Sequence, residues 1–171
     1  MLKSERLILR PVTIHDCEDI YEYSKNPNVG YRAGWKPHES KKETAAIMKM
    51  IFIGQDHIFG IILKSNNKLV GTIGLIHDPK RENKNAWMLG YALHEAYWGK
   101  GIMTEAAKLV IQYAKEQPNI TLISAYCYPY NPQSRRVLEK CGFEYEGLLR
   151  QAEVLYTGEI VDNLCFSMII K

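Results

Sequence analysis

The sequence has few of the features that mark metal-binding, disulfide-rich, membrane or nucleic-acid-binding proteins. Its four cysteines are scattered through 171 residues, without a Cys-x-x-Cys pair or a Cys/His spacing typical of zinc. The formal net charge is only +3 and no long run of Lys and Arg occurs, which argues against a nucleic-acid partner. No apolar run is long enough to span a membrane, and charged residues follow Met1 where a signal peptide would be apolar. We therefore expect a cytoplasmic protein with no metal and no membrane partner, whose cysteines are buried, reduced thiols.

The overall amino-acid composition is that of an ordinary globular domain. Hydrophobic residues make up 46% and charged residues 24% of the chain. The length suits one domain that buries a core without disulfide bonds. The chain contains no internal repeat, low-complexity tract or linker, so we expect a single domain over residues 1–171.

Hydrophobic periodicity and helix start signals predict an alternation of strands and helices. Thr13 with Asp16, and Ser40 with Glu43, have the spacing of capping boxes, and Asn131 followed by proline is a typical helix start. Helices are expected over 13–26, 40–54, 102–116 and 131–142, and strands over 6–10, 57–63, 69–76, 86–93, 120–126, 143–149 and 154–171, with a loop over 28–38 and a turn over 156–159. The pattern predicts a mixed α+β domain.

A glycine-rich turn, Gly99-Lys100-Gly101, joins one predicted strand to the following helix. Such a turn presents free backbone N–H groups to an anion. A P-loop would need Ser or Thr in place of Gly101, and a dinucleotide-binding fingerprint would need glycine in place of Thr104. The spacing leaves two interpretations open, a phosphate site at the helix N-terminus or a plain strand-to-helix turn.

The residues around this turn resemble a known family. Tyr97-Trp-Gly-Lys-Gly-Ile-Met-Thr-Glu-Ala106 is similar to the acetyl-CoA pyrophosphate loop of the GCN5-related N-acetyltransferase (GNAT) superfamily. Asn131-Pro-Gln-Ser134, continuing to Glu139-Lys-Cys-Gly-Phe143, resembles the second cofactor motif of that superfamily. The opening Arg6-Leu-Ile-Leu-Arg-Pro and the late Leu149-Arg-Gln-Ala-Glu153 are similar to the RimJ/RimL branch, the ribosomal-protein alanine N-acetyltransferases. The resemblance spans nearly the whole chain in the right order.

The resemblance implies a fold, a donor and an acceptor. The fold is the single-domain GNAT fold, a mixed, mostly antiparallel sheet of about six to seven strands flanked by about four helices. The donor is acetyl-CoA, and the acceptor is an amine, either a protein N-terminus or a small molecule. Trp98 and Met103 depart from the general superfamily loop, and Trp98 is common in the ribosomal branch. Because backbone amides bind the phosphates, these changes are compatible with cofactor binding.

Two catalytic residues follow from the resemblance. Many superfamily members protonate the departing sulfur with a Tyr at the position of Leu138, which has no proton to give. In the ribosomal branch a Ser takes this role, and it corresponds to Ser134. The glutamate of the family's Gln-Ala-Glu corresponds to Glu153, which is expected to remove the proton of the attacking amine, directly or through water. Glu95 is the alternative base.

The resemblance also implies a set of cofactor-binding residues. The strand 86–93 is expected to diverge from its neighbour near its end, leaving a gap that the pantetheine arm fills by strand addition. Asn131 is expected both to cap its helix and to hold an amide of the cofactor. The residues implied for cofactor binding are Tyr91, Ala92, Leu93, Trp98, Gly99, Lys100, Gly101, Ile102, Met103, Thr104, Asn131 and Arg136.

Several questions stay open at the level of sequence. A CoA-binding sensor or interaction module with the same fold is the alternative to an enzyme, although the presence of both Ser134 and Glu153 favours the enzyme. The acceptor is expected to meet the loops 31–38 and 156–159, where Tyr31, Trp35 and His38 form a candidate wall, but their residues do not identify it. Either a monomer or a homodimer fits the sequence.

Overall fold

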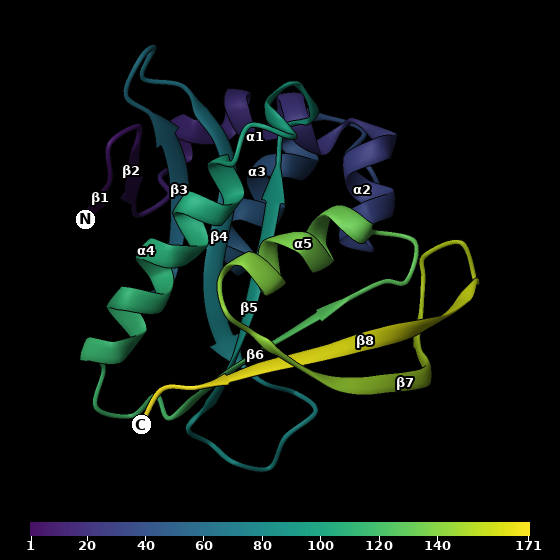
Figure 1. The fold of residues 1–171 in the computed structure, drawn as a ribbon. Helices are drawn as coiled ribbons and strands as arrows, with labels where there is room; N and C mark the ends of the chain where they lie inside the picture. The colour runs from purple at the N-terminus through teal and green to yellow at the C-terminus, as the bar shows by residue number, and fades with distance from the viewer.

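The computed structural model describes residues 1–171 and contains one eight-stranded sheet between two layers of helices (Figure 1). The strands lie in the order β1-β2-β3-β4-β5-β6-β8-β7. Their bounds are β1 (Leu2–Lys3), β2 (Leu7–Arg10), β3 (Ile58–Leu63), β4 (Leu69–His77), β5 (Ala86–Leu93), β6 (Leu122–Cys127), β7 (Glu144–Val154) and β8 (Ile160–Ile169). The helices are α1 (Cys17–Ser24), α2 (Pro27–Ala33), α3 (Lys41–Ile51), α4 (Ile102–Glu116) and α5 (Pro132–Lys140), with short 3₁₀ helices η1 (Ile14–Asp16) and η2 (Glu95–Tyr97).

The sheet is antiparallel everywhere except between β5 and β6. That parallel pair requires a crossover, and α4 provides it. The mixed, mostly antiparallel sheet expected from the resemblance is therefore confirmed. The observed sheet has one strand more than expected because the two-residue β1 pairs with β2 at the edge.

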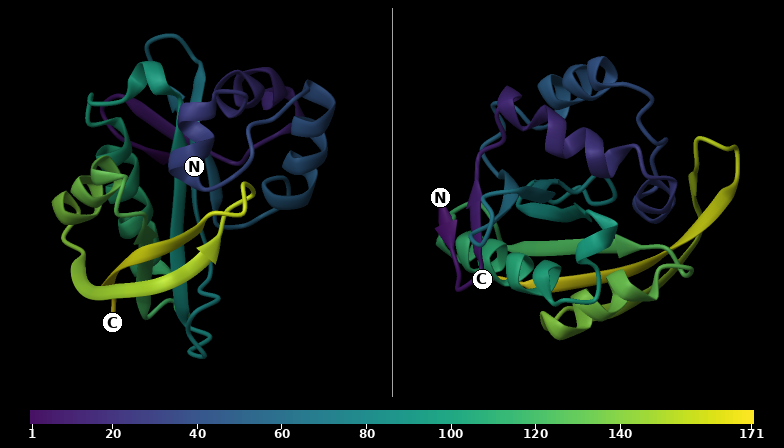
Figure 2. Two further views of the ribbon diagram at one scale, coloured as in Figure 1. Left: turned by 90° about the vertical axis from the view of Figure 1, so that its right-hand side faces the viewer. Right: turned by 90° about the horizontal axis from the view of Figure 1, so that it is seen from above.

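The two faces of the sheet are covered by different parts of the chain. Helices α1, α2 and α3 lie on one face and α4 and α5 on the other, as the view from above shows (Figure 2). The larger apolar core lies under α4, where Ala106, Ala107 and Val110 are fully buried. Small residues at these positions let the helix approach the strands closely, so α4 is held firmly above the centre of the sheet. None of the helices is both long and apolar enough to cross a bilayer.

Most of the predicted elements are present. The hairpin of β3 and β4, the strand β5 and the helix α4 match their predicted ranges within a residue or two. Thr13 N–H donates to Asp16 Oδ2 at 2.8 Å, and Glu43 N–H donates to Ser40 Oγ at 3.1 Å, so both predicted helix starts are confirmed. These capping signals involve residues only three positions apart, which explains why the sequence predicts both helix starts correctly.

The prediction of a loop over 28–38 is wrong, because α2 occupies its first half. The start signal is the same Asn-Pro pair that begins α5: Asn26 Oδ1 accepts from Asn28 N–H at 2.9 Å, and Pro27 stands at the first helical position. Gly34 ends the helix with a φ of 84°. Glycine inside the segment argued for a loop, but the cap and proline determine the local structure.

The predicted end of a strand at Leu149 is also wrong, because β7 continues to Val154. Its register against β8 shifts between Leu149 and Glu153, which marks a β-bulge. Gln151 lies in this bulge with a φ of 50°, a left-handed conformation unusual for a side chain larger than glycine. Its N–H donates to Asp162 Oδ1 of β8 at 2.7 Å, so the distorted segment remains attached to the sheet.

Candidate active site

The centre of the site is the point where β5 and β6 separate. The two strands pair only from Ala86 to Met88 on β5, so the remainder of β5 has a strand neighbour on the β4 side alone. The divergence expected near Tyr91 to Leu93 is thus confirmed. A cavity of about 600 Å³ opens between the separated strands, α2 and the first turns of α4 and α5. Its volume is in the range of small-molecule and cofactor sites.

The predicted anion-binding turn forms the rim of this cavity. Gly99 and Gly101 have φ values of 72° and 74°, which a residue with a side chain adopts only at a cost. The N–H groups of residues 99–104 donate to no other backbone group, because the first turn of α4 leaves them free. A Cβ at Gly101 would meet only Arg6 Nη2, at 3.6 Å. The turn therefore offers unpaired donors and open space, which fits a phosphate group.

Arg6, in the bend between β1 and β2, fixes this turn in place. Arg6 donates through Nη1 to the carbonyl of Lys100 at 2.9 Å and through Nε to Glu105 Oε2 at 2.7 Å. Glu105 stands in the first turn of α4, where a carboxylate interacts well with the helix dipole. The guanidinium of Arg6 balances this negative charge beside the turn, so the region remains favourable for an anion.

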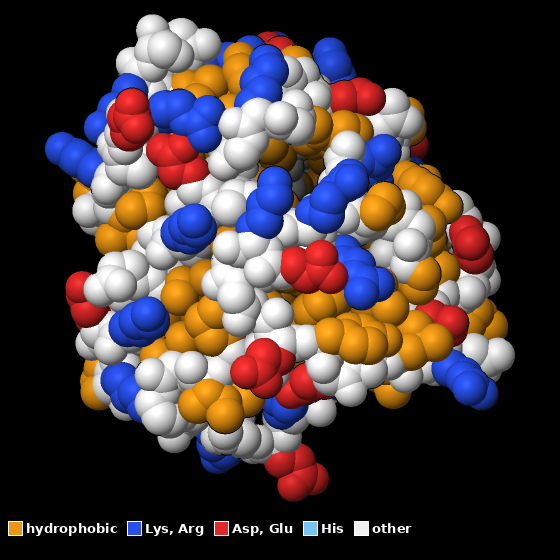
Figure 3. Space-filling view, in the orientation of Figure 1, with side chains coloured by type: hydrophobic (Ala, Val, Ile, Leu, Met, Phe, Trp, Pro, Cys, Tyr) orange, Lys and Arg blue, Asp and Glu red, His pale blue; other side chains and the backbone are white.

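The predicted cofactor residues come together at the cavity with one exception. All of those named from the sequence line it apart from Lys100, whose ammonium lies 5.3 Å from the ring of Tyr97. Arg136 and Lys140 add basic side chains on the α5 side. Figure 3 shows Lys and Arg side chains around a hollow with hydrophobic side chains inside it. This combination suits a ligand with an apolar arm and anionic groups.

Trp98 connects the turn to the opposite wall of the cavity. Its indole Nε1–H donates to the carbonyl of Leu93 at 2.9 Å, and the guanidinium carbon of Arg32 lies 4.4 Å from its ring centroid. Arg32 belongs to α2, the helix that the sequence did not predict. The cation–π contact therefore ties α2 to the turn that precedes α4.

Asn131 holds two elements together with one side chain. Its Oδ1 accepts from Ser134 N–H at 3.2 Å, the expected cap of α5, and its Nδ2 donates to the carbonyl of Arg32 at 3.2 Å. The amide is thus engaged at both ends by the chain itself. A cofactor contact through the Asn131 side chain would compete with the bond to Arg32.

Ser134 stands in the first turn of α5 and lines the cavity. Its Oγ lies 2.8 Å from the hydroxyl of Tyr91 on β5. Leu138, one turn further along, is 1% exposed and belongs to the core. It therefore does not take the place of the Tyr that protonates the sulfur in other members of the family. Ser134 is therefore the hydroxyl that α5 presents to the cavity.

Glu153 lines the same cavity from the opposite side. Its Oε2 accepts a hydrogen bond from the Tyr128 hydroxyl at 2.6 Å, and its Oε1 lies 3.7 Å from Lys80 Nζ. Burial and the neighbouring Glu153 carboxylate raise the pKa of Tyr128, so the phenol remains a neutral donor. The bulge at Gln151 directly precedes Glu153, and bulges commonly redirect a side chain beside an active site.

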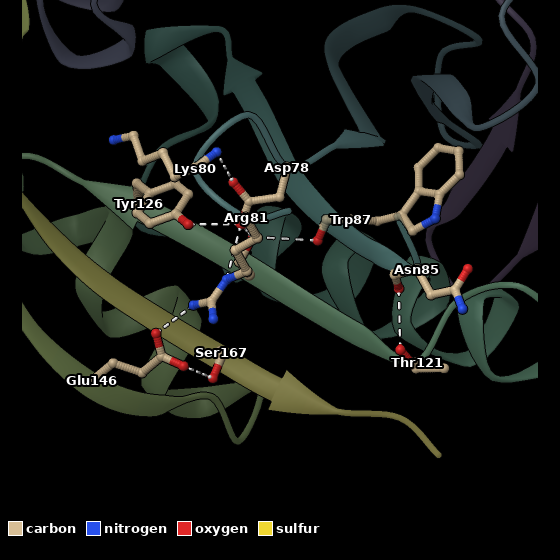
Figure 4. A network of polar contacts seen from close by, with 10 residues as sticks. Asp78, Lys80, Arg81, Asn85, Trp87, Thr121, Tyr126, Glu146 and Ser167 are labelled. Atoms are coloured by element: carbon tan, nitrogen blue, oxygen red, sulfur yellow. Dashed lines mark hydrogen bonds and ion pairs between the residues drawn. The ribbon is translucent and has the colours of Figure 1, made fainter. Parts of the chain in front are cut away.

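Lys80 lies beside Glu153 and also belongs to a polar network around Asp78. Figure 4 shows this network, between β4, β6 and β7. Lys80 N–H donates to Asp78, which also accepts from the hydroxyls of Ser124 and Tyr126. Burial opposes ionisation of Asp78, but these hydrogen bonds outweigh it and hold its pKa below the usual value. The Lys80 ammonium lies 4.2 Å from the Tyr126 ring centroid and is thereby held beside Glu153.

The alternative base, Glu95, occupies a different environment. Its carboxylate accepts from Asn26 Nδ2 at 2.5 Å and from Asn28 Nδ2 at 3.0 Å, which attaches η2 to the start of α2. Glu95 does not line the cavity, whereas Glu153 does. The geometry therefore favours Glu153 over Glu95 as a base.

Three stacked tyrosines form the wall beside Glu153. Tyr31 stacks on Tyr130 with ring centroids 4.5 Å apart, and Tyr130 stacks on Tyr128 at 5.0 Å. Tyr31 is 46% exposed and Tyr128 is buried, so the stack leads from the surface to the carboxylate. Of the expected wall residues, Trp35 instead packs against the core of α1 to α3, and His38 Nδ1 lies 2.8 Å from Thr44 Oγ1.

Fold and cavity together define an acetyltransferase of the GNAT type, and the comparison with family models agrees. A model of the acetyltransferase (GNAT) domain matches residues 6–144. The chain belongs to the GNAT acetyltransferase family.

Two curated relatives are acetyltransferases over nearly the whole chain. An N-acetyltransferase of Bacillus licheniformis, named uncharacterized N-acetyltransferase p20, is 31% identical and covers 98% of this chain and 95% of its own. The ribosomal protein uS5 alanine N-acetyltransferase of Escherichia coli is 26% identical and covers 95% of this chain and 87% of its own. The chain is thus an N-acetyltransferase with relatives in the ribosomal branch.

Solved structures agree with the fold. An acetyltransferase of the GNAT family from Bacillus anthracis superposes with a TM-score of 0.87 at 26% identity, covering 99% of this chain and 98% of that one. The microcin C7 self-immunity acetyltransferase MccE, solved with acetyl-CoA and AMP, superposes with a TM-score of 0.81 at 22% identity and covers 97% and 93%. At that identity the second likeness shows the fold alone.

Sequence reasoning missed three residues that contact the candidate catalytic and cofactor residues. They are Arg32 on Trp98, Tyr128 on Glu153 and Lys80 beside Glu153. Each contact joins segments far apart in the chain, so no spacing of residues along the sequence predicts it. The cap signal at Asn26-Pro27 could have placed Arg32 on a helix, but nothing local indicated its partner.

Proposed function

We propose that this chain transfers the acetyl group of acetyl-CoA directly to an amine. The observation that carries the proposal is that Ser134, Glu153 and the turn before α4 line one and the same cavity between the diverging β5 and β6. The family assignment supplies the type of reaction, and this arrangement supplies residues for each proton transfer. Bound acetyl-CoA contributes the activated acetyl thioester.

The residues present fit acetyl-CoA. The unpaired N–H groups of residues 99–104 suit its pyrophosphate, and the basic side chains of Arg136 and Lys140 lie on the same cavity. The end of β5, which lacks a strand neighbour towards β6, offers backbone groups to the pantetheine amides. The cofactor roles of Tyr91 to Leu93 and of the turn are part of the proposal.

Glu153 is proposed as the base. An amine is mostly protonated at neutral pH and becomes a nucleophile only after it loses a proton. Glu153 Oε2 is occupied by the Tyr128 hydroxyl, which leaves Oε1 and the remaining lone pair of Oε2 to accept that proton, directly or through water. Such assistance is worth about 10² to 10⁴ in rate.

Ser134 is proposed as the acid. The departing sulfur needs a proton, and Ser134 is the hydroxyl that α5 presents to the cavity. Backbone N–H groups near Tyr91 to Leu93 polarise the acetyl carbonyl as charge develops on its oxygen. Because the amine attacks directly, none of the cysteines takes part as a nucleophile.

The acceptor is proposed to be a primary amine, either a protein N-terminus or a small molecule. The relative that modifies ribosomal protein uS5 supports the first kind, and the open tyrosine stack from Tyr31 to Tyr128 admits either. The chain is proposed to act without nucleic acid or membrane, as a monomer or homodimer.

Release of free thiol from acetyl-CoA, measured against a panel of amines that includes ribosomal N-terminal peptides, tests the proposal. We expect turnover with at least one amine and its loss in Glu153→Gln. Acetyl-CoA binding by calorimetry without turnover on any amine would instead support a CoA-binding module without catalysis.

A further inference from the structure

The hydroxyl of Tyr91 has no role in the proposed reaction, although it lies at the centre of the site. The Tyr91 hydroxyl oxygen has two polar contacts: it lies 2.8 Å from Ser134 Oγ and 3.3 Å from the Ser134 carbonyl oxygen. Both partners belong to one residue on α5, while Tyr91 itself belongs to β5. The contact therefore joins β5 to α5, and both residues line the cavity in which the cofactor is proposed to lie.

The distances show which oxygen of Ser134 the Tyr91 hydroxyl bonds, and the relative acidity of the two hydroxyls indicates which of them donates. An O–H···O hydrogen bond normally measures about 2.5 to 3.0 Å, so the 2.8 Å contact with Ser134 Oγ fits and the 3.3 Å contact with the carbonyl is long. A phenol is also a stronger acid than an aliphatic hydroxyl, and is thus the better donor of the pair. On this ground Tyr91 is assigned as the donor and Ser134 Oγ as the acceptor.

We infer that Tyr91 is a positioning residue for Ser134: by donating to Ser134 Oγ, its phenol turns the Ser134 proton away from β5 and into the cavity. The inference rests on the proposed role of Ser134 as the acid. Were the direction reversed, the Ser134 proton would be held by the phenol oxygen and would not be available to the departing sulfur.

The same hydrogen bond strengthens during proton transfer. As the carbon–sulfur bond breaks, its electron pair remains on sulfur, which takes the proton of Ser134, and negative charge develops on Ser134 Oγ until solvent returns a proton. A hydrogen bond to a charged oxygen is about twice as strong as one to a neutral oxygen. Tyr91 therefore stabilises the transition state more than the ground state, and its contribution appears in kcat.

Burial keeps the Tyr91 phenol protonated, so that it remains a hydrogen-bond donor. Desolvation raises the pKa of the Tyr91 phenol, and the bond with Ser134 offsets only part of that effect. The phenol consequently keeps its proton to a higher pH than an exposed tyrosine does. It is a fixed donor, whereas Ser134 is the group that gives up a proton and regains it.

Tyr91→Phe tests the inference, since it removes the hydroxyl and keeps the ring. We expect kcat to fall about tenfold, which corresponds to the loss of one hydrogen bond, with the KM for acetyl-CoA and the calorimetric affinity for CoA unchanged. Combined with Ser134→Ala, Tyr91→Phe should lower kcat no further, because its effect acts through Ser134.

A second readout uses the protein without ligand. The losses in unfolding free energy caused by Tyr91→Phe and by Ser134→Ala should be less than additive, because both remove one hydrogen bond. Tyr23→Phe is the matched control: Tyr23 is buried, its hydroxyl lies 3.1 Å from Thr72 Oγ1, and it does not line the cavity. It should lower stability without changing kcat.

The outcomes separate this inference from the proposed function. A large loss of kcat in Ser134→Ala with wild-type kcat in Tyr91→Phe would overturn the role of Tyr91 alone. Additive stability losses, or a multiplicative loss of kcat in the double variant, would likewise overturn it. Wild-type kcat in Ser134→Ala would overturn the proposed acid and, with it, the role of Tyr91.

Discussion

Tyr128, the residue after β6, donates a hydrogen bond of 2.6 Å to Glu153 on β7, although β8 lies between these two strands in the sheet. The bond fixes one carboxylate oxygen of the proposed base, while Lys80 lies 3.7 Å from the other. A base held from both sides loses little orientational freedom when an amine arrives. Changes to Glu153 and to Tyr128 should therefore affect kcat to different degrees.

Glu153→Gln should reduce kcat by about 10² to 10⁴, because an amide cannot accept the proton of the amine. Tyr128→Phe should reduce kcat by only about tenfold, since the base remains and merely loses one hydrogen bond. Acetyl-CoA affinity, measured by calorimetry, should be nearly unchanged in both. Full activity of Glu153→Gln at neutral pH would remove Glu153 from the mechanism.

Gly101→Val should weaken acetyl-CoA binding about tenfold or more, because a β-branched side chain would stand beside the free N–H groups of the turn. The φ of 74° at Gly101 also strains any such side chain, by about 1 to 3 kcal/mol. Gly54→Val is the matched control: Gly54 has a φ of 77° and open space around it, and it lies outside the cavity. Calorimetry should find reduced affinity in the first variant only, and equal affinities would contradict the assignment of the turn.

Gln151→Gly should preserve activity and leave stability equal or slightly higher, because glycine adopts the φ of 50° in the bulge without strain. Gln151→Val should lower the free energy of unfolding by about 1 to 3 kcal/mol and lower kcat as well, since the bulge then no longer orients Glu153. Urea denaturation and steady-state kinetics check the pair. Wild-type stability and kcat in Gln151→Val would show that the bulge has no such role.

Stability should fall in acid, and Asp78 should account for part of the loss. Its pKa in the folded protein lies below that of an unperturbed aspartate, so its contribution to stability is present above the pKa of the unfolded state and is lost as the pH falls through the folded pKa. Asp16, whose burial is outweighed by hydrogen bonds from Arg10 and Thr13, behaves in the same way. The unfolding free energy of Asp78→Asn, measured in urea between about pH 5 and pH 2, should therefore depend less on pH than that of the wild type. Some pH dependence should remain, because Asp16 still titrates in the variant. Parallel curves would exclude Asp78 as a source.

Much of the fold follows from local signals. The helix start at Ser40 and the Asn131-Pro132 pair both act within one turn, and the hairpin of β3 and β4 follows from two β-prone runs with a polar turn between them. The helix α2 was missed because glycine in the segment was given more weight than the Asn26-Pro27 cap. The extension of β7 was missed because a bulge interrupts the alternation that marks a strand.

The motifs of the family, the turn at Gly99 to Gly101 and the candidates Ser134 and Glu153 can all be read from the amino-acid sequence. The folded structure adds that these groups share one cavity and that Glu95 does not line it. It also shows that Tyr91 contacts Ser134 and that Tyr128 and Lys80 contact Glu153. The reason is physical: helix caps and turns depend on neighbours within a few residues, whereas the contacts of the site join strands and helices that are brought together by sheet pairing and core packing. Such contacts leave no periodic or spacing signal along the chain.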